Sequence, residues 1–291
     1  NLYVTLEPCS HFGKTPPCTK KIIYKKINRV IFSINDTDPR SKNLAAKIFI
    51  KKKIKITSHI QQRFAKIFYK SYFTQLSKEL PFTDGKLAIS KDFFTINKKN
   101  RWITNKKSRK IVNFLRSKYD CLLTTSKTIN DDNPMLNCRL EGLEKKSPDL
   151  IILDRFFKIK KNSKVFNIKN RKVYIFTNSN NSLKEFFLKK KGIKIIKLKK
   201  CNERRIDLQN IFYKIKKLGF NRILVETGVT FLDELIKNNF IKNFYLFKSA
   251  TNLGIKGLNN LNPRYLKKIN FSKSNKIRVN LNGDSLYKVK I

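Results

Sequence analysis

Short runs of β-forming residues alternate with longer amphipathic segments along this chain, and this alternation constrains the fold more than any other feature. Clear examples are the apolar runs at residues 29–34 and 121–125 and the periodic segment at 61–76. Alternating strands and helices build parallel sheets, because each crossover between parallel strands needs a helix. The sequence therefore predicts an α/β protein, and its 291 residues suffice for two domains.

Apolar spacing and turn residues place the individual elements. Strands are expected at residues 2–6, 29–34, 54–58, 85–90, 121–125, 150–153, 172–176, 193–197, 222–226, 244–247 and 285–290. Helices are expected at residues 18–26, 44–52, 61–76, 106–118, 207–218 and 230–238.

The helix at 61–76 has an apolar stripe near helical spacing, formed by Phe64, Ile67, Phe68, Tyr72 and Phe73. We interpret this stripe as a face packed in the core. The alternating pattern then breaks at residues 77–81, where Pro81 interrupts it. The sequence therefore predicts two domains, residues 1–79 and 80–291.

Charge raises the question of a nucleic-acid partner, because 66 Lys and Arg against 20 Asp and Glu give a formal net charge of +46. The lysines are spread over every segment and accompany many Asn, Ile and Phe residues, which A/T-rich codons encode. A dedicated binder would concentrate its charge on one face or in a tail. We therefore expect no specific nucleic-acid partner, and a basic RNA-binding protein built on a decayed enzyme stays open as the alternative.

The five cysteines do not form the even, regularly spaced set of a disulfide framework. Cys121, Cys138 and Cys201 are scattered and are expected to be ordinary packed thiols. No apolar run is long enough to cross a bilayer, and residues 2–6 are typical of a strand rather than of a secretory signal. We therefore expect a cytoplasmic protein without a membrane partner.

The densest chemistry lies in T-L-E-P-C-S-H-F-G-K-T-P-P-C at residues 5–18. Zinc deaminases bind the metal through one His and two Cys, and a Glu that is not a ligand moves protons for the attacking water. Thiolates suit zinc, so Cys9 and Cys18 are the candidate metal ligands. Their spacing, with the His, Gly and paired Pro between them, resembles the deaminase half of the bifunctional riboflavin-biosynthesis deaminase-reductase family.

The rest of a zinc site is missing from this sequence. Neither His11 nor His59 is followed by Glu two positions later, so the chain has no H-x-E motif. In the family this motif lies upstream, which would place it before Asn1, and the first residue is not Met. We therefore expect a fragment or processed product whose residues 1–79 are the C-terminal part of a zinc-dependent deaminase domain. Deamination of the diaminopyrimidine precursor is expected only where the upstream H-A-E is present.

A Rossmann-type dinucleotide site is not expected, because no G-x-G-x-x-G follows any strand. Residues 222–230 instead offer a strand, a turn at Gly228 and a helix. The free N–H groups and the positive end of the dipole at such a helix start suit a phosphate. Thr230 and Asp233 are expected to start this helix as a capping box.

Four ordered segments resemble the reductase half of the same family: K-L-A-I-S-K-D at 86–92, R-W-I-T at 101–104, T-I-N-D-D-N-P-M-L at 128–136 and V-E-T-G at 225–228. The resemblance implies a truncated cytidine-deaminase-like α/β/α domain followed by a dihydrofolate-reductase-like α/β domain, with homodimers usual. It also implies an activity. The ribosyl group of 5-amino-6-(5-phosphoribosylamino)uracil would be reduced to ribityl, with NADPH supplying a hydride to the sugar C1′.

By this resemblance, the expected NADPH contacts are Ala88, Trp102, Thr128, Asp132, Gly228, Val229 and Thr230. The expected contacts to the phosphorylated aminopyrimidine substrate are Asn100, Arg116, Leu136, Arg139 and Glu226. The two arginines suit the sugar phosphate, because a guanidinium can bind it through two hydrogen bonds. Glu226 is the best candidate for an acid.

Ordinary structural interpretations remain beside these roles. Trp102 could be a core aromatic, Arg116 a solvated helix residue, and Glu226 a carboxylate attracted to the following helix. The sequence also departs from the family, whose S-x-D-G segment is Ser90 to Phe93 here, without the glycine. This loss could weaken binding, although the polar residues of the pattern are retained.

Overall fold

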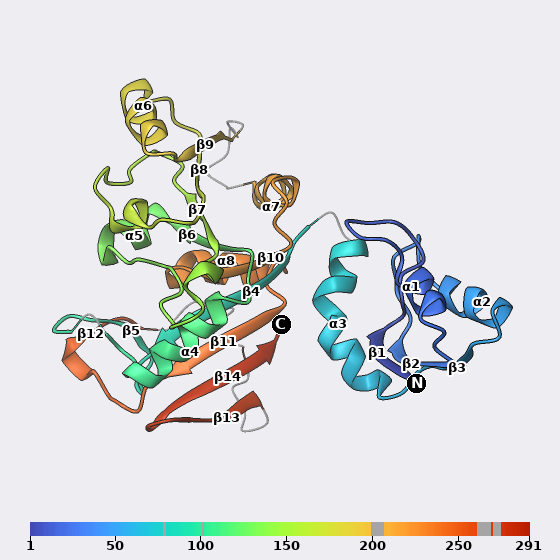
Figure 1. The fold of residues 1–291 in the computed structure, drawn as a ribbon. Coiled ribbons are helices and arrows are strands. Elements are labelled where there is room, and N and C mark those ends of the chain that lie inside the picture. Colours follow the sequence, from blue (N-terminus) through green and yellow to red (C-terminus); the bar gives the residue numbers. More distant parts are fainter. Residues whose placement is uncertain (78–79, 101, 199–206, 261–268, 270–274) are drawn as a thin grey trace. The chain divides into compact units, whose positions relative to one another are not determined.

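A computed structural model describes residues 1–77, 80–100, 102–198, 207–260, 269 and 275–291 (Figure 1). The chain forms two compact units, Asn1–Glu79 and Leu80–Ile291, which are described separately below. None of the helices within these ranges is long and apolar enough to cross a membrane. Cys121 and Cys138 are buried, as expected of packed thiols, and Cys201 lies outside the described residues.

The first unit is a three-stranded parallel sheet with three helices, blue to cyan in Figure 1. The sheet order is β1-β2-β3, with bounds Leu2–Leu6, Arg29–Ile34 and Lys55–Thr57. The helices are α1 (Cys18–Tyr24), α2 (Leu44–Lys51) and α3 (Gln62–Ser77). Val30 and Phe32 of β2 pack with Ala45 and Phe49 of α2 in the centre of the unit.

The predicted burial of the α3 stripe is wrong. Phe64, Ile67 and Phe68 have exposed fractions of 69%, 67% and 75%. The helix meets its neighbours through tyrosines instead: the hydroxyl of Tyr69 lies 2.6 Å from Thr5 Oγ1, and Tyr72 donates to Asp36. Helical spacing correctly predicted an apolar face, but spacing alone does not say what covers that face.

The second unit is built on one large sheet of nine strands in the order β13-β14-β11-β4-β10-β6-β7-β8-β9. The strands from β11 to β9 in this order are parallel, whereas β14 runs antiparallel to both β11 and β13. The strand bounds are β4 Phe82–Ile89, β6 Cys121–Thr125, β7 Asp149–Leu153, β8 Val173–Thr177, β9 Lys194–Lys197, β10 Arg222–Glu226, β11 Asn243–Lys248, β13 Lys276–Leu281 and β14 Asp284–Lys290.

Helices cover both faces of this sheet (Figure 1). One face packs on α7 (Leu208–Lys217) and α8 (Val229–Lys237), and the other packs on α4 (Lys106–Arg116), α5 (Ser126–Asp132) and α6 (Ser182–Lys190). Because neighbouring strand residues point to opposite faces, the strands carry nearly continuous apolar runs. Short additional elements are β5 (Phe94–Asn97) paired with β12 (Gly257–Asn260), and 3₁₀ turns at Glu144–Lys146, Lys164–Asn167 and Gly254–Lys256.

Gly85 in β4 allows α8 to approach the sheet closely. A Cβ atom at this position would lie 2.9 Å from Leu232 Cδ1 and 3.2 Å from a ring carbon of Phe244. The predicted strand therefore extends through the glycine and begins at Phe82 rather than at Gly85. Glycine is needed at this position because a side chain would collide with its neighbours, and not because the backbone turns here.

The order of the central strands indicates where the second unit could bind a ligand. The chain passes from β4 to β6 and later returns to insert β10 between them, so the three strands lie side by side, with β4 continuing past the end of β10 to Ile89. In open α/β sheets, ligands bind outside the carboxyl ends of strands where the strand order changes direction. Of the expected site residues, Glu226 ends β10, Gly228 follows it, and Thr128 follows β6 at this edge.

Candidate functional site

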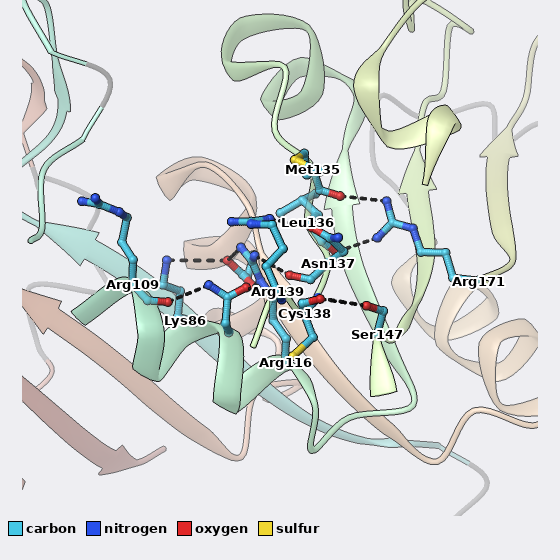
Figure 2. Close-up of polar contacts among 12 residues, drawn as sticks. Lys86, Arg109, Arg116, Met135, Leu136, Asn137, Cys138, Arg139, Ser147 and Arg171 are labelled. Carbon is cyan, nitrogen blue, oxygen red and sulfur yellow. Dashed lines mark hydrogen bonds and ion pairs between the residues drawn. The ribbon is translucent and has the colours of Figure 1, made fainter. Parts of the chain in front are cut away.

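An ion cluster of Lys86, Arg116 and Glu226 lies at this edge (Figure 2). Arg116, the last residue of α4, donates from Nε to Glu226 Oε1 over 2.6 Å and from Nη2 to Oε2 over 3.0 Å. Lys86 Nζ lies 3.6 Å from Oε2, and the register of β4 and β10 sets Lys86 directly opposite Glu226. Two strands and a helix thus hold one carboxylate between two cations.

The protonation of Glu226 follows from these neighbours. Burial by itself would raise the pKa of this carboxyl, but Arg116 and Lys86 outweigh burial and lower the pKa to about 2. Glu226 is therefore ionised at neutral pH, which does not support its interpretation as an acid. Burial also lowers the pKa of Lys86, against the attraction of Glu226.

Arg116 is buried and is therefore not a solvated helix residue. The third nitrogen of its guanidinium group also has a partner. Nη1 donates to the carbonyl of Asn137 over 3.0 Å, so the side chain joins the ion cluster to the segment that follows α5. Three of its five N–H groups are thus engaged, which leaves one on Nη1 and one on Nη2 for a phosphate. Arg139 is exposed, and its Nη1 donates to the side-chain oxygen Oδ1 of Asn137, the residue whose carbonyl Arg116 binds.

Side chains from other segments hold most of the polypeptide from Met135 to Arg139, which we call the 135–139 loop (Figure 2). Leu136 is buried and has a φ of 50°, an unusual conformation for a branched side chain. The contacts that fix the backbone come from Asn113, Arg116, Ser147 and Arg171. The two expected substrate contacts Leu136 and Arg139 thus lie on one preorganised loop.

A second part of the edge combines two helix starts. Thr125 caps α5 by accepting from the N–H of Thr128, and Thr227 Oγ1 lies 3.4 Å from the hydroxyls of both residues. Gly228 is the N-cap of α8, with no side-chain cap, so the predicted capping box of Thr230 and Asp233 is wrong. Helix α8 begins one residue earlier than expected because the extended backbone of Gly228 leads directly into Val229.

The expected NADPH contacts differ in their surroundings. Gly228 and Thr230 are exposed, Val229 is half-buried, and Thr128 lies in the first turn of α5. Asp132 is exposed one turn further along α5 than Thr128.

Ala88 lies in β4 itself, and Trp102 lies in the loop before α4. Ala88 is half-buried opposite Phe247 of β11. Trp102 is 45% exposed, so it is not a core aromatic. The guanidinium of Arg109 lies 4.5 Å from the centre of the Trp102 ring, and the backbone N–H of Trp102 donates to Asn100 Oδ1 over 3.1 Å.

In the Ser90–Phe93 turn, Phe93 occupies the position of the family's glycine. Phe93 has a φ of 70°, which glycine adopts readily and phenylalanine does not. The turn is nevertheless closed: Ser90 Oγ donates to Asp92 over 2.5 Å, and Asp92 accepts from the backbone N–H groups of Leu253 and Gly254.

In the first unit, Cys9 and Cys18 lie together: the N–H of Cys18 donates to Cys9 Sγ over 3.3 Å. Burial and the neighbouring thiol of Cys9 raise the pKa of Cys18. Among the residues that the structure describes, no three His, Cys, Asp or Glu side chains form a group that could hold a metal ion. The donors present therefore do not fit a catalytic zinc by themselves, since such sites use three protein ligands.

The neighbouring polar residues have structural partners. Glu7 is buried and accepts from the backbone N–H groups of Asp36, Asn43 and Ala45, which fixes the start of α2. The Nδ1 atom of His11 lies 2.8 Å from Ser41 Oγ.

Sequence reasoning missed Lys86, Asn113, Asn137 and Arg171. Lys86 had a usable signal, because a lysine inside a central strand is rarely buried without a partner. The others act through backbone contacts between segments far apart in the sequence, which no local pattern reveals.

Comparisons with known proteins agree on one family. The model of the RibD C-terminal domain matches residues 84–277. Riboflavin biosynthesis protein RibD of Aquifex aeolicus is 32% identical over 261 residues, which cover 87% of this chain and 70% of that protein.

Solved structures agree as well. A structure of Acinetobacter baumannii RibD matches with a TM-score of 0.82 at 20% identity, covering 99% of this chain and 80% of that chain. A diaminohydroxyphosphoribosylaminopyrimidine deaminase/5-amino-6-(5-phosphoribosylamino)uracil reductase from Thermotoga maritima matches with a TM-score of 0.77 at 27% identity, covering 99% and 78%.

Proposed function

The chain belongs to the RibD family of riboflavin biosynthesis proteins, and on this basis we propose that its second unit reduces 5-amino-6-(5-phosphoribosylamino)uracil. The reaction adds a hydride and a proton to the ribosyl group and yields the ribityl group. The alternative of a basic RNA-binding protein receives no support from the comparisons.

The observation that carries this proposal is the charge arrangement at the carboxyl end of β10, where Glu226 lies opposite Lys86 in the interior of β4. Lys86, Arg116 and Arg139 supply three cations, and Glu226 supplies one carboxylate, so the group has a surplus of two positive charges. A sugar phosphate carries up to two negative charges and would balance this surplus. The ionised Glu226 can accept hydrogen bonds from sugar hydroxyls or ring N–H groups.

The residues at the neighbouring helix starts fit NADPH. A Cβ at Gly228 would have no heavy atom within 4 Å in the described part of the chain, so phosphate oxygens can approach the start of α8. The exposed ring of Trp102 offers an apolar surface beside Arg109. When bound, NADPH supplies the hydride for the sugar C1′. The protein residues hold both molecules and, with buried Leu136, help to exclude water.

We assign no deamination step to the first unit. Zinc binding and deamination by Cys9 and Cys18 would need the H-A-E segment expected upstream, because two thiols alone do not complete the site. A cytoplasmic homodimer completes the proposal, and sedimentation of the purified protein would test the dimer.

Turnover tests the proposal directly. The purified chain should oxidise NADPH only when the aminouracil phosphoribosyl substrate is present, and mass spectrometry should find a product heavier by two hydrogens. Glu226→Gln should lower kcat/KM by at least about tenfold, because it removes the charge of the central carboxylate. Glu185→Gln, a change on α6, is the matched control and should behave like the wild type. A folded wild-type protein that never oxidises NADPH with this substrate would refute the proposal.

A further inference from the structure

We propose that Arg171 is a positioning residue that holds the 135–139 loop in its substrate-binding shape; this inference rests on the proposed function. Arg171 lies outside every motif that led to that function, in the segment just before β8. Figure 2 shows its side chain reaching toward the loop, with dashed lines to Met135 and Leu136.

The guanidinium of Arg171 binds three backbone carbonyls. Nη1 donates to Leu136 over 2.6 Å, and Nη2 donates to Met135 over 2.8 Å and to Val165 over 3.2 Å. The planar fork of arginine matches two consecutive carbonyls, which the single ammonium of lysine cannot do. Val165 belongs to a buried cluster beneath the loop, so the same guanidinium ties the loop to the core.

Leu136 needs such a restraint. Its φ of 50° costs a branched residue about 1–2 kcal/mol relative to ordinary backbone, so the loop would relax without an external contact. The other anchors act later in the loop: Arg116 on the carbonyl of Asn137, and Ser147 on both backbone groups of Cys138. Arg171 is the side chain that fixes the carbonyls of Met135 and Leu136.

The charge of Arg171 supports this role. Burial, and to a smaller extent the nearby Arg116, lowers the pKa of Arg171 to about 10, so the guanidinium is still protonated at neutral pH. Its partners in the loop are carbonyl oxygens, and hydrogen bonds from a charged donor to such oxygens are stronger than neutral ones. The charged side chain thus holds the backbone of the loop, and we assign it no contact with substrate.

Steady-state kinetics of Arg171→Met and Arg171→Lys test the inference. Loss of the fork should raise KM for the aminouracil substrate about tenfold in Arg171→Met, which corresponds to about 1.4 kcal/mol. The value of kcat should stay within about threefold, because Arg171 does not touch the reacting atoms. Arg171→Lys should give an intermediate KM. Arg155→Met removes a guanidinium that lies over Phe156 instead, and should match the wild type.

Amide hydrogen exchange supplies a readout that does not depend on turnover. In Arg171→Met or, if that variant does not fold, in Arg171→Lys, the N–H groups of Cys138 and Arg139, which donate to Ser147 and Asn113, should exchange faster, while those of β7 should not change. Unchanged exchange in the loop, or a fall of kcat at constant KM, would overturn the inference and leave the proposed function standing. Faster exchange in a protein whose wild type has no reductase activity would support the clamp and refute the proposed function alone.

Discussion

Replacing Glu226 by Gln should destabilise the second unit strongly at neutral pH. The pKa of Glu226 is lowered from its ordinary value of 4.5 to about 2, because Arg116 and Lys86 outweigh the effect of burial. This lowering corresponds to about 3 kcal/mol of stability contributed by the ionised carboxylate. Glutamine keeps the shape and loses that contribution, and it leaves the two cations without their common partner.

The sign of the pH dependence is fixed by the direction of the shift. A carboxyl whose pKa is lower in the folded state stabilises the fold fully above its unfolded pKa. For Glu226 the contribution should therefore be complete above about pH 5 and disappear as the pH falls toward about 2. The difference in unfolding free energy between wild type and Glu226→Gln should shrink over the same range.

Urea unfolding at several pH values measures this difference. Trp102 is the single tryptophan of the chain and lies in the second unit, so its fluorescence reports on that unit. Glu185→Gln is the control, since Lys197 lowers the pKa of Glu185 at the protein surface, where ion pairs contribute at most about 1 kcal/mol. A difference for Glu226→Gln that stays below about 1 kcal/mol, or that does not change with pH, would refute the reasoning.

Three further changes have definite expected results. Phe93→Gly should be more stable than Phe93→Ala by about 1 kcal/mol in urea unfolding, because alanine keeps the strain of a positive φ. Gly85→Ala should lower the melting temperature and the unfolding free energy, by about 1–3 kcal/mol, because its Cβ would meet Leu232. Replacing Cys9 and Cys18 together by Ser should leave the reductase KM and kcat unchanged, because both lie in the first unit.

Sequence patterns predicted the strands of the two larger sheets except β13, together with the longer helices, and the structure confirms these elements with ends shifted by a few residues; β5, β12 and β13 were missed. Helix α5 was missed because its residues Ser126–Asp132 include one apolar side chain, Ile129, so no periodicity exists to detect. Helix α6 was also missed, and its apolar residues Leu183 and Phe186 are 79% and 61% exposed.

For the candidate site, the sequence predicted residues but not the contacts between them. The family resemblance pointed to Arg116, Leu136, Arg139 and Glu226, and the structure brings these residues close to one another. The motifs did not show that Arg116 is already engaged by Glu226. That contact joins residues 110 positions apart, and only the pairing of β10 between β4 and β6 creates it.

The double engagement of Arg116 links the charge of the site to its shape. One guanidinium holds Glu226 through Nε and Nη2 and the 135–139 loop through Nη1, so a change at either partner is transmitted to the other. A positive group that is fixed before substrate arrives needs no reorganisation on binding, which favours fast and specific reaction. With three N–H groups of Arg116 engaged in this way, we propose that Arg139, at the exposed end of the loop, contributes most to binding of the sugar phosphate. The geometry of that loop in turn depends on Arg171, so phosphate affinity should be set by a residue that never meets the phosphate.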